Sequence, residues 1–171
     1  VRSSWVTLVV NSLLALLAAS GVTAADVMSA DLSEFEALAG LEARGELPLH
    51  VFYCPPLGGD LLLYKRLRDR ARGRLEFGWL KGFVDGAFES KTAAVLEPYA
   101  DGGGRGQFSL EPARLNALVR EAQAGGFAVA LHAVGDAAVR AALDAVKAAA
   151  DLPRPARLPR GEHAAGVPPD A

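Results

Sequence analysis

The sequence predicts an α/β fold in which a parallel sheet is flanked by helices. Segments with the composition of buried strands alternate with helical segments of roughly a dozen residues, which is the pattern of βαβ crossovers. The chain has 171 residues, of which 51% are hydrophobic and 22% are charged, a composition typical of a globular domain with its own core. A doubly wound sheet and a (β/α)8 barrel both satisfy this alternation. No G-x-G-x-x-G follows a strand, which argues against dinucleotide binding.

The charge balance and the cysteine count exclude further classes. The formal net charge is −2 and the sequence pI is about 5.9, whereas nucleic-acid-binding domains carry a basic surface. We therefore expect no nucleic-acid partner. Cys54 is the single cysteine of the sequence, so no internal disulfide can form, and we interpret it as a small buried residue.

The N-terminal segment allows two interpretations. Residues 5–22 carry no charge, which is typical of a signal peptide or membrane anchor and would make the protein exported. Apolar residues also recur there at helical spacing, which predicts a buried globular helix over residues 1–21. The residues of this apolar stripe are Val6, Val9, Val10, Leu13, Leu14 and Leu17. We favour the buried helix, a cytoplasmic location and no membrane partner.

The first half of the chain continues with alternating elements. Apolar runs predict strands at 22–28, 47–54 and 75–86. Between them, helices are predicted at 33–44, with Ser33 as the N-cap, and at 60–73, with Asp60 as the N-cap. Pro55 and Gly58 fall in the turn that ends the second of these strands.

The second half repeats the pattern after a long loop that is rich in glycine around residues 101–106. A helix is predicted at 109–126, with Pro112 in its first turn and Gly125 at its end. A strand at 127–135 and a helix at 136–151, capped by Asp136, follow. The tail at 151–171 is rich in proline and has at most one short strand near Glu162 and His163.

The strand at 127–135 ends in a histidine. Side chains alternate along a strand, so Phe127, Val129 and Leu131 face one side, where helices would cover them. Ala128, Ala130 and His132 face the other side, and the small residues suit a crowded interior. His132 lies at the carboxyl end, where barrel enzymes place their chemistry. By itself, the residue equally fits a structural histidine that is hydrogen-bonded at a strand end.

A lysine in the preceding apolar strand strengthens the case for a site. Lys81 shares one face with Trp79 and Phe83, and an unpaired buried charge there is costly. The lysine can extend to solvent, lose its charge through a lowered pKa, or be converted chemically. His163 comes later, in "RGEHA". Lys81 and His132 are 51 positions apart, and His132 and His163 are 31 positions apart. Each separation corresponds to one βα unit, because the first one also includes the long loop. Three candidate ligands would therefore end successive strands and suit a divalent metal.

Four motifs carry a resemblance to a known family: K-x-F-x-D-G, TAA-x-x-x-PYAD, LHAVGDAAV and EHA. They occupy Lys81 to Gly86, Thr92 to Asp101, Leu131 to Val139 and Glu162 to Ala164. Together they closely resemble the amidohydrolase superfamily, and more narrowly amidohydrolase family 3, in its N-substituted formamide deformylase-like branch. Residues 15–30 also resemble that family's second strand and the helix before it, so the resemblance spans nearly the whole chain.

The resemblance implies a partial (β/α)8 TIM-barrel metal-dependent hydrolase, with about strands two to six in one domain over residues 1–171. It implies a divalent metal, usually zinc, held by Lys81, His132 and His163. Lys81 would be the fourth-strand lysine that is carboxylated by CO2 in many members of the superfamily. Asp85, Lys91 and Thr92 would lie on the substrate side of the site. Asp136 is more simply a helix cap than a catalyst, and Glu162 either orients His163 or faces away.

The sequence also departs from the family pattern. It contains no H-x-H pair, which the family's first strand carries, and no aspartate of the final strand, and "LPRGEH" replaces the usual run before His163. His50 stands alone, and the first residue is Val1 rather than methionine. We expect a truncated member, with no catalytic residue assigned, whose complete relatives hydrolyse a C–N bond of a small-molecule amide. We also expect self-association through exposed barrel edges. A non-catalytic α/β remnant is the alternative.

Overall fold

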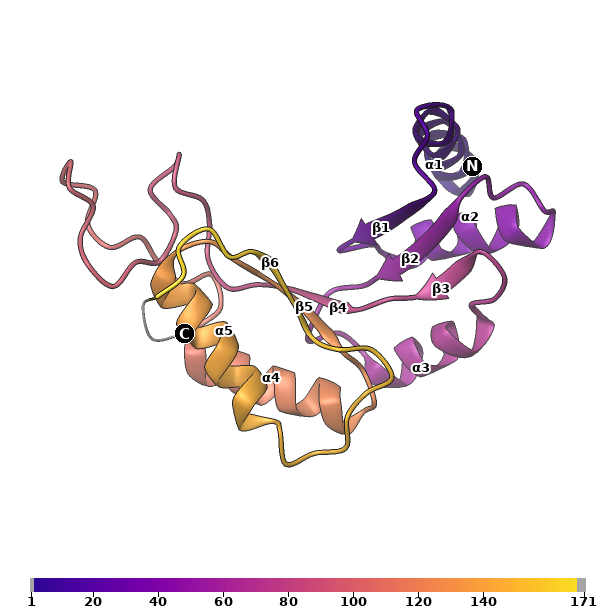
Figure 1. Cartoon of the computed structure of the whole chain (residues 1–171). Coiled ribbons are helices and arrows are strands. Elements are labelled where there is room, and N and C mark those ends of the chain that lie inside the picture. Colours follow the sequence, from indigo (N-terminus) through magenta and orange to yellow (C-terminus); the bar gives the residue numbers. More distant parts are fainter. Residues whose placement is uncertain (1, 169–171) are drawn as a thin grey trace. The chain divides into compact units, whose positions relative to one another are not determined.

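The computed structural model describes residues 2–168, and their side chains from residue 5 onward. The chain forms two compact units, Val1–Trp79 and Leu80–Ala171. Each unit contains one three-stranded sheet whose neighbouring strands are parallel, together with helices (Figure 1). The predicted α/β class with parallel sheets is therefore confirmed, while a single barrel domain over 1–171 stays a prediction.

The first unit builds its sheet in the order β1-β2-β3. Its core gathers aromatic rings: Phe35 and Tyr53 meet edge to face with centroids 5.0 Å apart, and Phe77 lies 5.8 Å from Tyr53. The Tyr53 hydroxyl donates to the Asp31 carbonyl, and burial raises the pKa of this phenol. The elements are α1 Arg2–Ala19, β1 Ala24–Met28, α2 Leu32–Ala43, β2 His50–Cys54, α3 Leu61–Arg70 and β3 Leu75–Phe77.

The helix starts in this unit follow side-chain capping. Asp60 caps α3 by accepting the N–H groups of Leu62 and Leu63, as predicted. The prediction of Ser33 as the cap of α2 is wrong, because Asp31 accepts the N–H groups of Ser33 and Glu34. The Glu34 carboxylate accepts the Asp31 N–H in return, at 2.7 Å, which completes a capping box. These hydrogen bonds satisfy three backbone donors, so the helix begins one residue earlier than predicted.

The predicted N-terminal helix is present as α1, but its expected burial is largely wrong. Of the apolar stripe only Leu14 is buried, whereas Val6 and Val10 are half-buried. The remaining members are exposed: Val9, Leu13 and Leu17. Apolar side chains occur all around this helix, so packing against α2 covers only a part of them. No helix within residues 2–168 combines the length and hydropathy that a membrane span requires.

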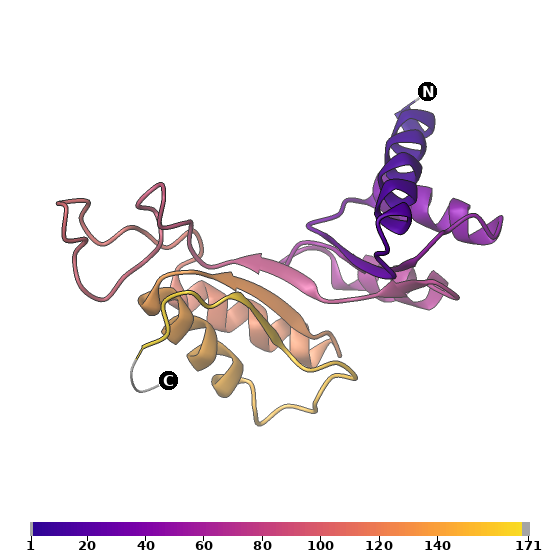
Figure 2. The ribbon, with the colours of Figure 1, turned by 45° about the horizontal axis from the view of Figure 1, so that its top comes forward.

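The second unit orders its strands β4-β5-β6 and packs α4 and α5 against one face of the sheet (Figure 2). The elements are β4 Leu80–Phe83, α4 Pro112–Ala124, β5 Val129–Ala133, α5 Asp136–Ala148 and β6 Arg160–His163. The predicted short strand near Glu162 and His163 is therefore confirmed as β6. Pro112 begins α4, and Gly125 follows its last residue, both as predicted.

One predicted strand, residues 75–86, is in fact two. β3 and β4 belong to separate sheets, and the break falls at Gly78 and Trp79. A Cβ atom at Gly78 would lie 2.6 Å from the Cys54 sulfur, so the backbone comes too close to β2 for a larger residue. The apolar residues on both sides of Gly78 hid this break, although a glycine within a strand pattern is its usual signal.

The predicted alternation along β5 is confirmed. Leu131 and Ala133 line an apolar groove together with Val139 and Ala142 of α5, so this side of the strand faces the helices. Ala130 and His132 therefore face the opposite side, because successive strand residues alternate. His132 pairs in register with Phe83 of β4. The face of the sheet that is turned away from α4 and α5 thus carries the histidine.

Candidate metal site at the carboxyl ends of β4, β5 and β6

Two predicted ligands, His132 and His163, lie side by side. Their ring centroids are 4.6 Å apart and the rings meet edge to face. The register pairs His163 with Ala133 and pairs His132 with Glu162, so regular strands would point the two imidazoles to opposite faces. His163 instead has a φ of 70° at the end of β6. This left-handed conformation is costly for a residue other than glycine, and it ends the strand where the two rings meet.

The third predicted ligand, Lys81, lies on the neighbouring strand β4 but does not end it as predicted, because it is the second residue of the strand and pairs in register with Ala130. Its side chain is 6% exposed, so it stays buried instead of extending into solvent. The Nζ atom lies 4.0 Å from the centroid of the Phe83 ring and donates to the Gly82 carbonyl at 3.2 Å. The Phe83 ring in turn lies 5.3 Å from the His132 ring. The sheet therefore carries all three candidates on adjacent strands, with Phe83 in contact with two of them.

The hydrogen bond of His132 fixes which ring nitrogen carries the proton. Its Nε2 atom lies 2.9 Å from the Gly86 carbonyl oxygen. A carbonyl oxygen can only accept, so Nε2 must donate, and in the neutral imidazole the lone pair is then on Nδ1. The structural hydrogen bond and a ligand role are therefore compatible in this residue, because they use different nitrogens.

Asp85 lies beneath the loop and not on an open surface. Its side chain is fully buried, and both carboxylate oxygens accept backbone N–H groups. Oδ1 accepts from Val134 at 2.9 Å, and Oδ2 accepts from Gly135 at 2.8 Å and from Ala94 at 2.9 Å. The family resemblance places this residue on the substrate side, which stays a prediction. The anchoring role that the structure gives it was missed, although an aspartate directly after a strand and before a glycine was a usable signal.

The other two predicted substrate residues, Lys91 and Thr92, lie in the loop of residues 87–108 that follows β4 (Figure 1). Lys91 is exposed and pairs with Asp101 at 2.7 Å, and this hydrogen bond holds the pKa of the Asp101 carboxyl below its usual range. The Thr92 hydroxyl accepts the Ala87 N–H and so closes the turn between them. Contact of Lys91 and Thr92 with a substrate stays a prediction.

Two acidic residues have partners that the sequence did not reveal. Asp136 is not the cap of α5, because Gly135 occupies that position and Asp136 is the first helical residue. Its carboxylate instead accepts the N–H of Leu96 at 2.8 Å, which ties the loop to the helix. Glu162 pairs with Arg160 on the same strand.

Gly135 marks the closest approach of this loop to the β5–α5 turn. A Cβ atom there would lie 1.9 Å from the Ala94 carbonyl oxygen, which cannot move away as a flexible side chain would. We expect Gly135→Ala to lower the free energy of unfolding by about 1–3 kcal/mol, because overpacking forces the backbone apart. Urea denaturation measures this loss. Gly161→Ala is the matched control, since no atom lies within 4 Å of its Cβ position, and an equal loss in both variants would contradict the argument.

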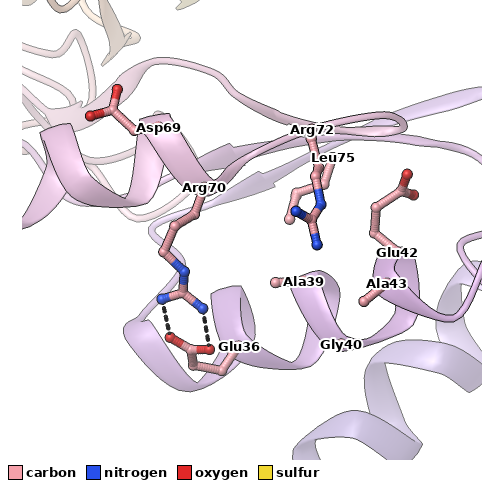
Figure 3. A pocket seen from close by; sticks show the side chains of 9 residues that line it. All are labelled: Glu36, Ala39, Gly40, Glu42, Ala43, Asp69, Arg70, Arg72 and Leu75. Atoms are coloured by element: carbon pink, nitrogen blue, oxygen red, sulfur yellow. Dashed lines mark hydrogen bonds and ion pairs between the residues drawn. The ribbon is translucent and has the colours of Figure 1, made fainter.

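A cavity of about 420 Å³ lies elsewhere, in the first unit (Figure 3). It lies beside Leu75 at the amino end of β3, whereas ligand sites of α/β sheets lie at the carboxyl ends. Arg70 and Glu36 form two hydrogen bonds there, at 2.6 and 2.7 Å, which hold the pKa of the Glu36 carboxyl below its usual range. This position makes the cavity a gap between outer helices and not the candidate site. It is lined by Glu36, Ala39, Gly40, Glu42, Ala43, Asp69, Arg70, Arg72 and Leu75.

The chemistry of the candidate site depends on the lysine. Within residues 2–168, no three side chains of histidine, cysteine, aspartate or glutamate converge so as to hold a metal ion. Imidazole nitrogens are common metal donors, but ligation of a metal by His132, His163 and Lys81 stays a prediction. A lysine ligates a metal only after it has lost its positive charge.

Solved structures resemble this fold. An uncharacterised metal-dependent hydrolase of Pyrococcus horikoshii OT3 matches 85% of the chain with a TM-score of 0.74 and 28% identity. A second such hydrolase, from Pyrococcus furiosus, matches 81% with a TM-score of 0.69 and 32% identity. In each case the chain covers 30% of the solved protein. The α/β fold with parallel sheets is thus similar to that of metal-dependent hydrolases.

Curated proteins and a family profile give the same relationship. The putative amidohydrolase YtcJ of Bacillus subtilis is 36% identical over 85 residues, which is 49% of this chain and 16% of that protein. The exoenzymes regulatory protein AepA of Pectobacterium carotovorum subsp. carotovorum is 32% identical over 119 residues, 66% of this chain and 25% of that protein. The chain therefore spans a quarter or less of these relatives. A profile described as the amidohydrolase family matches residues 7–171, and the chain belongs to the amidohydrolase family.

Proposed function

We propose that this chain forms part of a zinc-dependent hydrolase that cleaves C–N bonds of small amides, with Lys81, His132 and His163 as metal ligands. The observation that carries the proposal is the edge-to-face contact of His132 and His163, whose ring centroids are 4.6 Å apart at the carboxyl ends of β5 and β6. The burial of Lys81 on the adjacent strand supports it. The hydrolase names of the similar structures support a divalent metal.

The donor set fits zinc. Imidazole nitrogens and a carboxylate-like oxygen are common zinc ligands. The Lys81 ammonium would first lose one proton, and reaction of the resulting amine with CO2 would give a carbamate and release a second proton. An anionic oxygen donor would then stand in place of the buried cation. The lone pair on Nδ1 of His132 is available, because Nε2 already donates to the Gly86 carbonyl. When bound, zinc polarises an amide carbonyl and makes water acidic enough to attack at neutral pH.

The rest of the chain would organise that chemistry. Hydrolysis adds one water across the C–N bond and yields a carboxylic acid and an amine. The loop of residues 87–108 follows β4 at the same end of the sheet and would form one wall of the substrate pocket, with Lys91 and Thr92 facing the amide. Asp85 and Asp136 hold its base through the N–H groups of Ala94 and Leu96.

We also infer that the two sheets belong to a (β/α)8 barrel and that the finer relationship is to the N-substituted formamide deformylase-like branch. The strand order within each sheet follows chain order, as barrel winding requires, whereas a doubly wound sheet reverses direction. The sequence contains no H-x-H pair, so a competent site would need ligands from outside these residues. Exposed apolar side chains on α1, among them Trp5, Leu8 and Leu16, support self-association of this chain.

A zinc-binding and turnover experiment tests the proposal. We expect the 171-residue chain to bind zinc weakly in calorimetric titrations and to show little turnover of N-formyl and N-acyl amides. His132→Ala should abolish the binding, while His50→Ala should leave it unchanged, because His50 is an exposed residue of β2 in the first unit. Equal zinc binding by the two variants, or no zinc binding by the parent chain, would contradict the proposed metal site and favour a non-catalytic remnant. Robust zinc-dependent turnover that His132→Ala removes would mean that the missing ligands are replaced.

A further inference from the structure

We propose that Asp85 is a positioning residue that fixes the ring orientation and the tautomer of His132. Its carboxylate locks the end of β4 to the loop and to the β5–α5 turn, and the Gly86 carbonyl that follows it holds the imidazole. The inference rests on the proposed function in one respect: in that proposal His132 is a metal ligand. The positioning itself is a property of this chain with or without metal.

The first step is the burial of Asp85 among backbone donors. Its side chain is fully buried, and three N–H groups converge on its two oxygens at 2.8–2.9 Å. These donors come from Ala94 in the loop and from Val134 and Gly135 after β5. Hydrogen bonds to a charged acceptor are stronger than neutral ones, and a buried donor that loses its partner carries a full desolvation cost. One side chain thus fixes three segments that are far apart in sequence.

The second step links these segments to the histidine. The residues on either side of Asp85 both contact His132: the Val84 N–H donates to its carbonyl at 2.9 Å, and the Gly86 carbonyl accepts from its Nε2 at 2.9 Å. The Gly86 N–H in turn donates to the Thr92 carbonyl at 3.2 Å. The Ala87 N–H, which shares a peptide group with the Gly86 carbonyl, donates to Oγ1 of Thr92 at 3.0 Å. Gly86 is therefore held on its loop side by Thr92 and on its strand side by the anchored Asp85, on which we infer that the orientation of its carbonyl depends.

The third step excludes a direct hydrogen bond. The Oδ1 atom of Asp85 lies 3.8 Å from Nε2 of His132, which is too long for a hydrogen bond although the two groups are neighbours. The hydrogen bond to the ring therefore comes from the Gly86 carbonyl, and Asp85 acts by positioning that group. A purely structural anchor would stabilise the loop but would leave the proton of His132 where it is, so the position of that proton separates the two roles.

The experiment compares Asp85→Asn with Asp101→Asn in the full chain. The Asp85→Asn change keeps the size of the side chain, but the NH2 group of the new amide cannot accept, so at least one of the three N–H groups loses its partner. The matched control, Asp101, is an exposed residue of the loop of residues 87–108 that Asp85 anchors, and its partner is Lys91. Hydrogen exchange at Ala94, Val134 and Gly135, and the 15N shifts of the His132 ring at about pH 8, where histidine is neutral, are the readouts. His132→Ala assigns the ring signals.

We expect the parent chain to hold the proton of His132 on Nε2. Asp85→Asn should speed exchange at the three amides by about tenfold or more and convert His132 to a mixture of tautomers, while Asp101→Asn changes neither. An unchanged tautomer in Asp85→Asn, or the same change in the control, overturns the inference. A parent chain whose His132 carries its proton on Nδ1 also overturns the inference. This measurement on the parent chain tests the inference even if the Asp85→Asn variant does not fold.

Zinc titration of the same samples separates this inference from the proposed function. A parent chain that binds no zinc but shows the tautomer response removes the metal proposal and supports the positioning role. Zinc binding that persists in Asp85→Asn with an unchanged tautomer leaves the metal proposal standing and overturns the positioning role. The Asp85→Glu variant retains the charge and both acceptor oxygens, so it should restore the Nε2 tautomer of His132 in part. If Asp85→Glu changed the tautomer as much as Asp85→Asn does, the carboxylate would not be the group that positions His132.

Discussion

Lys81→Ala is expected to reduce the zinc affinity of the chain by about 100-fold or more, since even residues that only support a ligand contribute about 10–100-fold. In the proposed site Lys81 supplies the anionic donor beside the two imidazoles, and alanine supplies none. Dialysis against a zinc buffer, followed by metal analysis of the protein, measures the retained zinc. The effect should persist with added CO2, because the alanine variant has no amine to carboxylate.

Two controls separate ligation from packing. Lys65→Ala removes an exposed lysine from α3 and should leave zinc retention unchanged. Lys81→Met keeps an unbranched apolar side chain over the Phe83 ring, and it should lose zinc as Lys81→Ala does while unfolding at nearly the parent temperature. Equal zinc retention in the Lys81→Ala and Lys65→Ala proteins would show that Lys81 is not a ligand.

Phe35→Ala should lower the free energy of unfolding by about 3–5 kcal/mol, the usual cost of deleting a buried aromatic ring. Phe35 is fully buried in the first unit, where its ring meets Tyr53, and the Arg70 guanidinium lies 5.1 Å from its centroid. Because domains are stable by only about 5–15 kcal/mol, we expect a large fall in the midpoint of denaturant unfolding. Circular dichroism across a urea series follows it.

Phe88→Ala is the matched substitution for this second prediction. Phe88 is 38% exposed in the loop after β4 and touches Tyr99 only at a centroid distance of 6.4 Å. Its removal should cost well under half as much as the removal of Phe35. Comparable losses in the two variants would mean that the aromatic cluster around Tyr53 does not dominate the stability of its unit.

Local pattern predicted the fold well where a single signal decided an element. Alternating strand and helix segments predicted the parallel sheets, and Asp60 and Pro112 marked helix starts correctly. The prediction of helix starts failed where two possible capping residues lie close together in the sequence. Asp31 and Ser33 are both good caps, and only the reciprocal bond from Glu34 decides between them. Apolar periodicity in α1 likewise predicted burial that depends on what packs against the helix.

The candidate site was predictable in its residue types and not in its geometry. The order of strands brought His132 and His163 to neighbouring positions, but the register alone would have separated their rings. The contact between the two imidazole rings depends on the left-handed backbone conformation of His163, which no sequence pattern predicts. The position of Asp85, directly after a strand and before a glycine, was a signal for an anchoring role. Its partners could not be predicted, because they are backbone groups, which residue identity does not specify.

The loop of residues 87–108 divides into a base that is tied to β4, β5 and α5 and a tip that has open space beside it. Asp85 and Asp136 fix the base, and the Ser109 N–H donates to the Val84 carbonyl where the loop returns. At the tip, no atom lies within 4 Å of the Cβ positions of Gly102 and Gly104. Lengthening a loop there costs little closure entropy. Insertions and deletions at the tip can therefore accumulate over evolution without disturbing the histidines.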